Sequence, residues 1–329
     1  MTQSLWHLVA DIGGTNARFA LAHAHSGQLE LVRKYRVADF ESFEKVLACF
    51  IAEMGPATKV RGACVAVASM VDGDVLRLTN NRWIVDRNYI GRCLGGAQVI
   101  LINDFVAIGH AVGALDPGQW RQIGGGEGVA GWPCAVLGAG TGLGTCTLVP
   151  AAAGDNVLEG EGGHVEFAPC NEREVDVLRL LWKKYQRVSV ERLLSGSGIL
   201  NIYQALATLT ERAAVHAEPE AISAQALAEP ASLAADALAM FCAIFGSVAG
   251  NMALTVGARG GVYIAGGIAP RIVDFLAASQ FRARFEDKGR FRSYVHDIPV
   301  RVLLADNLGL TGAARCLQRM NNHGSHDGK

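Results

Sequence analysis

The feature that most constrains the fold of this chain is a pair of adjacent glycines, Gly13-Gly14, between two apolar runs. The pattern predicts a buried strand at residues 5–10, a turn, and a second strand at 19–22. Glycine leaves backbone amides uncovered, and a concave row of amides suits a phosphate. The same dipeptide is common in ordinary hairpins, so the glycines alone leave both interpretations open. Asp11, just before the turn, favours a phosphate accompanied by a metal ion, because a carboxylate repels a bare phosphate.

The composition indicates a folded protein of two ordinary domains. The chain has 329 residues, of which 50% are apolar and 19% are charged, so it can bury two cores. Lysine and arginine (30) almost balance aspartate and glutamate (31), and no basic run occurs. Nucleic acid and an anionic membrane are therefore not expected as partners.

The cysteines indicate a reducing compartment. All eight are scattered without a CxxC pair, which argues against a disulfide framework or a zinc knuckle and favours the cytoplasm. The chain does not begin with a basic region followed by a long apolar core, so no signal peptide is expected. The most apolar segment, residues 233–256, is interrupted by Asp236 and several small residues. We therefore predict a core helix there rather than a membrane span.

The opening pattern of strand, glycine-threonine turn and strand recurs in the second half of the chain. Strands are predicted at 134–137 and 145–149, and between them Gly140-Thr141 falls on the position of Gly14-Thr15. Two such turns would suit a nucleotide bound between two similar halves. A third glycine-bracketed strand ends in Gly266-Gly267, where a flat adenine ring could approach the backbone. A strand packed closely against a helix explains that pattern equally well.

The remaining pattern alternates strands and helices, as an α/β protein does. The glycine-rich interval 116–131 is predicted to be a loop and a domain junction, and the polar tail from Asn321 is expected to fray. Further strands are predicted at 29–37, 63–68, 99–102 and 300–304, and helices at 41–54, 86–94, 105–114, 172–185, 190–194, 198–209, 231–256 and 308–320.

With these elements in order, the chain closely resembles the bacterial glucokinase family, which is distinct from the zinc-containing group of repressors and sugar kinases. The resemblance covers nearly the whole chain. It rests on matching stretches at 11–18, 103–104, 138–144, 160–167, 191–198, 260–268 and 285–299.

The resemblance implies an α/β fold of two domains, the actin-like ATPase (ribonuclease H-like) fold, with an interdomain cleft. The implied small domain covers residues 1–112 and is completed by the C-terminal strand and helix, 301–329. The large domain covers residues 113–300. The implied reaction is ATP-dependent phosphorylation of D-glucose at the 6-hydroxyl to give glucose 6-phosphate and ADP, entering glycolysis (EC 2.7.1.2). A cytoplasmic homodimer is also implied.

Asp104 is the residue that we expect to act as the base. It follows a buried strand, where ligand contacts collect in α/β sheets, and it can accept the sugar's proton as the bond to phosphorus forms. The pattern alone favours a helix N-cap at this position, and the family match reverses that preference. A sugar must be bound by several polar groups at once. The implied glucose contacts are Asn103, Asp104, Glu161, His164 and Glu191.

The expected nucleotide site is divided between the glycine turns. Asp11 is expected to hold Mg²⁺ through water, because magnesium keeps much of its hydration. In the zinc-containing group, the histidine that matches His164 binds metal and a cysteine cluster follows it. Here only Cys170 follows nearby, so no zinc is expected. Neither Asn16, Arg18 nor the stretch 285–299 has an assignable role. The full expected set for MgATP is Ala10, Asp11, Ile12, Gly13, Gly14, Thr15, Gly140, Thr141, Gly266 and Gly267.

Three rival functions remain open from the residues. One is a kinase for another hexose or for several hexoses, because hydroxyl discrimination depends on very small displacements. The second is a sugar-responsive regulator of the same fold that binds its ligand without catalysis. Such regulators usually carry an added DNA-binding helix pair, for which the strand beginning at Leu5 leaves no room. The third, a polymerising or chaperone ATPase, is disfavoured by the sugar-contact set.

Overall fold

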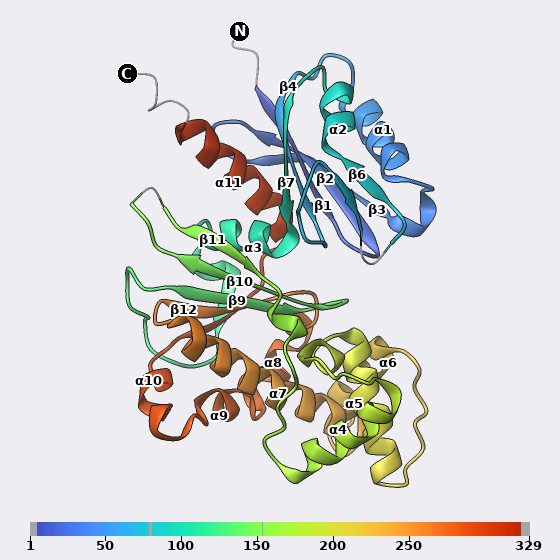
Figure 1. Cartoon of the computed structure of the whole chain (residues 1–329), viewed down its shortest axis with the longest axis vertical. Coiled ribbons are helices and arrows are strands. Elements are labelled where there is room, and N and C mark those ends of the chain that lie inside the picture. Colours follow the sequence, from blue (N-terminus) through green and yellow to red (C-terminus); the bar gives the residue numbers. More distant parts are fainter. Residues whose placement is uncertain (1–4, 79–80, 153, 324–329) are drawn as a thin grey trace. The chain divides into compact units, whose positions relative to one another are not determined.

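The computed structural model describes residues 5–78, 81–152 and 154–323. Its internal contacts divide the chain into two compact units (Figure 1). Unit 1 contains the residues up to Leu115 together with those from Ala305 onward, and unit 2 contains Asp116–Leu304. The last helix runs to His323, and the rest of the predicted polar tail lies outside the described residues.

Unit 1 is built on a mixed five-stranded sheet of order β3-β2-β1-β4-β7. The first three strands form an antiparallel meander, and β4 and β7 then run parallel to β1. The strands are β1 (Trp6–Ile12), β2 (Asn16–His23), β3 (Leu29–Arg36), β4 (Val60–Val67) and β7 (Gln98–Asn103), with a separate ribbon of β5 (Val75–Arg77) and β6 (Ile84–Asp86). The helices are η1 (Val37–Asp39), α1 (Phe43–Met54), α2 (Arg87–Cys93), α3 (Asp104–Val112) and α11 (Leu308–His323).

Helices cover both faces of this sheet, which explains why its central strands are apolar on both sides. Along β1, alternate residues such as Leu8 and Ile12 join a core with the apolar side of α1. Val9 points the other way, into a smaller core with Leu310 and Ala313 of α11. Figure 1 shows α1 and α2 on one side of the sheet and α11 on the other.

Unit 2 repeats this plan on a larger scale. Its six-stranded sheet has the order β11-β10-β9-β12-β13-β8. The first five strands match the order and the directions of the unit 1 sheet, so the internal repeat is confirmed and extends beyond the hairpin. The strands are β8 (Trp120–Gln122), β9 (Cys134–Ala139), β10 (Leu143–Val149), β11 (Asn156–Gly160), β12 (Gly261–Ala265) and β13 (Val300–Leu303).

Helix α7 (Leu233–Val256) is the centre of the unit 2 core. It is long and apolar enough to cross a membrane, yet 67% of its most apolar window is buried inside the protein, as predicted for a core helix. Gly246 and Gly250 let α9 approach, because a methyl group at either position would collide with the backbone of α9. The other helices are η2 (Pro117–Gln119), η3 (Gly162–His164), α4 (Glu172–Lys184), η4 (Val190–Arg192), α5 (Gly196–Leu209), α6 (Pro219–Ala228), η5 (Ala269–Ile272), α8 (Val273–Ala278), α9 (Phe281–Glu286), η6 (Gly289–Phe291) and α10 (Arg292–His296).

The final strand corrects one expectation. We expected the C-terminal strand to complete the small domain, but β13 pairs with β12 and β8 in the unit 2 sheet, and only α11 returns to unit 1. Strand β13 belongs to unit 2 because both of its edges are hydrogen-bonded there, one to β12 and the other to β8.

Several short elements also differ from the prediction. The loop expected at 116–131 contains η2 and the edge strand β8, and the helix expected at 190–194 is the single turn η4. Strand β11 and helices α6, α9 and α10 were not predicted. Most of these elements are only three to six residues long. That length is too short for hydrophobic periodicity to reveal them.

The stretch 285–299, which had no explanation in the sequence, fastens α9 to α10 and to the strand after them. Arg282 donates from Nε to Glu286 at 2.6 Å and from a terminal nitrogen to the carbonyl of Ile298 at 3.0 Å. His296 faces the other oxygen of Glu286 at 3.1 Å. Burial alone would raise the pKa of Glu286, but the contacts with His296 and Arg282 hold it below its ordinary value.

Candidate functional site

The first glycine turn is a tight hairpin. Ile12 lies opposite Ala17, and the Gly13 amide donates to the carbonyl of Asn16 at 2.9 Å, so Gly14-Thr15 is a two-residue loop. The hairpin interpretation is therefore correct. It does not exclude a phosphate site, because a tight turn is also what presents backbone amides.

Asp11 lies beside this hairpin, and its carboxylate is 3.4 Å from the guanidinium of Arg18 on the paired strand. Its side chain is 19% exposed. Burial raises the pKa of Asp11, and Arg18 offsets only part of that rise. Gly309, in the first turn of α11, leaves the space for the carboxylate, since an added methyl group would lie 2.6 Å from its carbon. The contact gives Arg18 a structural role that the sequence did not reveal.

Asp11 fits the kind of magnesium site that nucleotides bring with them. Mg²⁺ in such sites is held by one or two carboxylates, by phosphate oxygens and by water. Among the described residues no group of three or more His, Cys, Asp and Glu side chains could hold a metal ion. A single carboxylate such as Asp11 suits a metal that water and substrate oxygens also bind. The expected absence of zinc stays a prediction.

The strand register places Asp11 and Asp104 at the same edge of the unit 1 sheet. Ile12 pairs with Val67, and Val67 pairs with Asn103, so all three strands end in one row. Two strand spacings of about 4.8 Å separate β1 from β7, a span of about 10 Å. The carboxyl edge of parallel strands is the usual place for ligands in α/β sheets.

Asn103, and not Asp104, is the N-cap of α3. Its side-chain oxygen accepts the amides of Phe105 at 2.7 Å and Val106 at 3.2 Å, and Asp104 is the first residue of the helix. Asp104 also accepts the Phe105 amide, at 2.9 Å. The side-chain nitrogen of Asn103 donates to the carbonyl of Ser69 at 3.4 Å. Ser69 therefore belongs to this edge, and no pattern in the sequence indicated it.

The second glycine turn lies next to the third one. The Gly140 amide donates to the carbonyl of Gly142 at 2.8 Å, which closes a shorter loop around Thr141. Gly266 has a φ of +81°, and a methyl group there would collide with the carbonyl of Ala139. Gly267 has no atom within 4 Å of such a methyl group, so open space lies beside it. The four predicted nucleotide residues of unit 2 thus meet at the carboxyl edge of β9 and β12.

Glu161 and His164 lie on the loop after β11, with His164 Nδ1 3.4 Å from a Glu161 carboxylate oxygen. Both side chains are about half exposed, at 51% and 60%. The loop is fastened to β10, because Thr145 donates from its hydroxyl to Gly160 and accepts from the Gly162 amide at 3.0 Å.

Glu191 reaches the same strand from η4, where its Oε2 accepts the amide of Leu143 at 2.9 Å. The η3 and η4 turns are themselves joined, because the Val190 amide donates to the carbonyl of Val165 at 2.9 Å. The structure thus brings the three predicted sugar contacts of unit 2 around the start of β10.

Comparison with known proteins decides the family. The glucokinase family model matches residues 8–320. The chain belongs to the glucokinase family. A glucokinase from Shigella sonnei is 43% identical over 316 residues, which cover 96% of this chain and 98% of that relative. The crystal structure of a glucokinase from an Antarctic psychrotroph superposes with a TM-score of 0.83 at 36% identity, covering 95% of this chain and 98% of the other.

A more distant glucokinase, from Balamuthia mandrillaris in complex with glucose, shows the same fold at 22% identity, with a TM-score of 0.77 and coverage of 96% and 94%. The prediction of a two-domain α/β fold of the actin-like ATPase group is confirmed. The resemblance to the bacterial glucokinase family is confirmed as well, and with it the reading of the chain as an ATP-dependent kinase.

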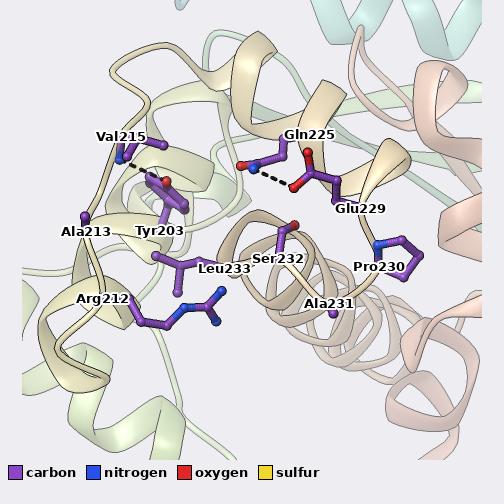
Figure 2. A pocket seen from close by; sticks show the side chains of 10 residues that line it. All are labelled: Tyr203, Arg212, Ala213, Val215, Gln225, Glu229, Pro230, Ala231, Ser232 and Leu233. Atoms are coloured by element: carbon purple, nitrogen blue, oxygen red, sulfur yellow. Dashed lines mark hydrogen bonds between the residues drawn. The ribbon is translucent and has the colours of Figure 1, made fainter.

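A separate pocket of about 630 Å³ lies in unit 2 (Figure 2). The pocket includes none of the residues predicted for the glucokinase reaction. In the close-up, the Val215 amide donates to the hydroxyl of Tyr203, and Gln225 donates to Glu229. Its lining residues are Tyr203, Arg212, Ala213, Val215, Gln225, Glu229, Pro230, Ala231, Ser232 and Leu233.

Proposed function

We propose that Asp104 and the two glycine hairpins carry out the reaction of the glucokinase family: transfer of the terminal phosphoryl group of ATP to the 6-hydroxyl of D-glucose, giving glucose 6-phosphate and ADP. The observation that carries the proposal is the row formed by Ile12, Val67 and Asn103. It supports a common reaction for the phosphate hairpin and Asp104, because the residues that follow these strands share one sheet edge.

Asp104 accepts the proton of the 6-hydroxyl as that oxygen attacks phosphorus. Phosphoryl transfer asks the protein mainly for position and charge stabilisation, with a base for the attacking hydroxyl. A carboxylate of ordinary basicity serves, because the hydroxyl becomes acidic as its bond to phosphorus forms. Asn103 holds the neighbouring backbone of α3 in place and contributes its amide to the sugar.

Residues of both units bind MgATP in this proposal. The amides around Gly13, Gly14 and Thr15, with Ala10 and Ile12 beside them, and those around Gly140 and Thr141 hold the phosphates. Gly266 and Gly267 lie against adenine, which the open space beside Gly267 supports. Asp11 would hold Mg²⁺ through water. The ion, when bound, neutralises charge on the phosphates.

Glu161, His164 and Glu191 complete the sugar site, and their convergence on β10 supports this. We further propose that the protein acts in the cytoplasm as a homodimer. All eight cysteines are free thiols, which agrees with a reducing compartment.

The test is ADP release from MgATP, measured against a panel of hexoses that includes glucose, mannose and fructose. The expected result is release that glucose stimulates with the highest kcat/KM of the panel. Equal stimulation by several hexoses would replace glucose with a broader substrate class. If no sugar stimulates release, the proposed function is wrong.

A further inference from the structure

Glu191 touches the phosphate hairpin of unit 2 with one oxygen only. Its Oε2 accepts the Leu143 amide at 2.9 Å, directly after the Gly140–Gly142 loop. A methyl group at Gly142 would collide with this oxygen, so the glycine is what lets the carboxylate lie against the loop. Within the described part of the chain, Oε1 makes no hydrogen bond to the protein. The carboxylate therefore has one oxygen for the hairpin and one for a ligand.

Two buried polar side chains, Ser195 at the cap of α5 and Asn201 within α5, donate hydrogen bonds to the backbone of the Glu191 turn. The hydroxyl of Ser195, the N-cap of α5, donates to the carbonyl of Glu191 at 2.8 Å. Asn201 is 3% exposed, and its Nδ2 donates to the carbonyl of Arg192 at 2.9 Å. The oxygen of Asn201 accepts from Lys184 Nζ at 3.0 Å and from the Tyr185 hydroxyl at 3.2 Å. Both polar side-chain atoms of Asn201 are thus hydrogen-bonded.

The start of α5 is also bonded to the hairpin. The amide of Gly196, its first residue, donates to the carbonyl of Gly140 at 2.8 Å. The Glu191 turn and the hairpin are therefore joined at two points, the Leu143 amide and the Gly140 carbonyl. These two hydrogen bonds connect the position of Glu191 to the loop around Thr141.

We propose that Glu191 couples sugar binding to nucleotide binding, and that Asn201 is the positioning residue that sets this coupling. The inference rests on the proposed function, in which Glu191 contacts glucose. A sugar hydroxyl donates to Oε1 and fixes the carboxylate plane, so that Oε2 holds the Leu143 amide and orders the hairpin for phosphate. Each ligand then favours the same arrangement of the hairpin, and the coupling is reciprocal.

The experiment measures the affinity for MgADP by calorimetry, without glucose and with saturating glucose. In the unaltered protein glucose should tighten MgADP binding by about 5-fold or more, within the usual range of such couplings. In Glu191→Gln the amide oxygen can still accept from Leu143, but the NH₂ group cannot accept from a sugar hydroxyl. The coupling should then vanish, with the ratio of the two affinities close to one.

Asn201→Ala removes the support of the turn and should lower the coupling ratio to below about twofold, a loss of the interaction between sites rather than of either site. Tyr185→Phe is its matched control, because it removes a neighbour of Asn201 and leaves the bond to the Arg192 carbonyl. It should keep the full coupling. Thermal unfolding of each variant checks that it is folded, and Glu191→Gln decides the question if Asn201→Ala does not fold.

The outcomes separate this inference from the proposed function. If the unaltered protein phosphorylates glucose and Glu191→Gln keeps the full coupling ratio, Glu191 does not couple the sites. If Asn201→Ala weakens both ligands and leaves the ratio unchanged, Asn201 is only structural. If the unaltered protein neither binds nor phosphorylates a hexose, the proposed function itself fails.

Discussion

The two glycine hairpins occupy the same place in two sheets that share the order of five strands, yet they are supported differently. In unit 1 the hairpin lies beside charged groups, the Asp11–Arg18 pair, with Asp104 two strands away at the same edge. In unit 2 the hairpin packs on glycine backbone at Gly266 and accepts support from Glu191.

In the proposed function, the two copies of one repeated scaffold serve different parts of the reaction. The acids at the edge of unit 1 suit metal and proton chemistry, and the uncovered backbone of unit 2 suits phosphate and a flat ring. A repeat conserves the turn that presents amides, whereas the side chains around it decide which part of the reaction each copy serves. Substitutions in the two units should therefore change different properties of the protein.

Asp104→Asn should have the largest effect, because it removes the base of the proposed reaction. The kcat should fall by about 10²- to 10⁴-fold, the usual contribution of a general base, while glucose binding stays within a few-fold. Steady-state kinetics and calorimetry measure the two quantities. Near-normal turnover would assign the base elsewhere.

Asp86→Asn is the matched control for that substitution. Asp86 lies at a comparable junction of strand and helix, where it ends β6 and its side chain caps the amides of Asn88 and Tyr89 at the start of α2. Asparagine caps as well as aspartate does, so kcat should not change. A similar loss of activity in both variants would mean that the effect of Asp104→Asn is structural.

Gly266→Ala and Gly267→Ala test the backbone site of unit 2. At Gly266 a side chain meets the Ala139 carbonyl at a φ of +81°, so the free energy of unfolding should fall by about 1–3 kcal/mol. At Gly267 nothing lies within 4 Å, so stability should hold while the KM for ATP rises by roughly tenfold, or about 1.4 kcal/mol. An unchanged KM for ATP in Gly267→Ala would contradict an adenine site beside Gly267. Urea denaturation and steady-state kinetics measure both.

Asp11→Asn tests the charged support of unit 1. If Asp11 holds Mg²⁺ through water, the magnesium concentration for half-maximal activity should rise by about tenfold, as for other partners outside a metal's inner shell. Asp39→Asn breaks an exposed ion pair with Arg36 and should leave the magnesium requirement unchanged. Equal effects of the two substitutions would contradict a metal role for Asp11.

Much of both hairpins could be predicted from the sequence, because glycine, flanking apolar runs and an acid are local signals. The partners of the hairpins were not local. Glu191 is 48 residues from Leu143, and β13 finds β8 from the far end of unit 2. Asn103 rather than Asp104 caps α3, since two adjacent polar residues compete for one cap and only the backbone geometry decides between them.

The smallest expected effect is on the pH dependence of stability. As the pH falls, the contributions of Asp11 in unit 1 and Glu286 in unit 2 to the free energy of unfolding should change in opposite directions. The pKa of Asp11 is raised, so its contribution to stability is full below the ordinary value of 3.8 and is lost as pH rises through the folded pKa. The pKa of Glu286 is lowered, so its contribution is present above 4.5 and is lost as pH falls through the folded pKa.

Glu286→Gln should therefore lower the free energy of unfolding by about 1 kcal/mol at neutral pH, because the charged acceptor for Arg282 and His296 is lost. The difference from the unaltered protein should begin to shrink as pH falls below 4.5 and disappear below the folded pKa, where Glu286 is neutral in both the folded and the unfolded chain. Asp11→Asn should show the reverse: greater stability than the unaltered protein at neutral pH, and convergence in acid. Urea denaturation from pH 7 down to about pH 3 follows both. Curves that move in the same direction would show that the two carboxylates lie in similar surroundings, against the contrast between the units.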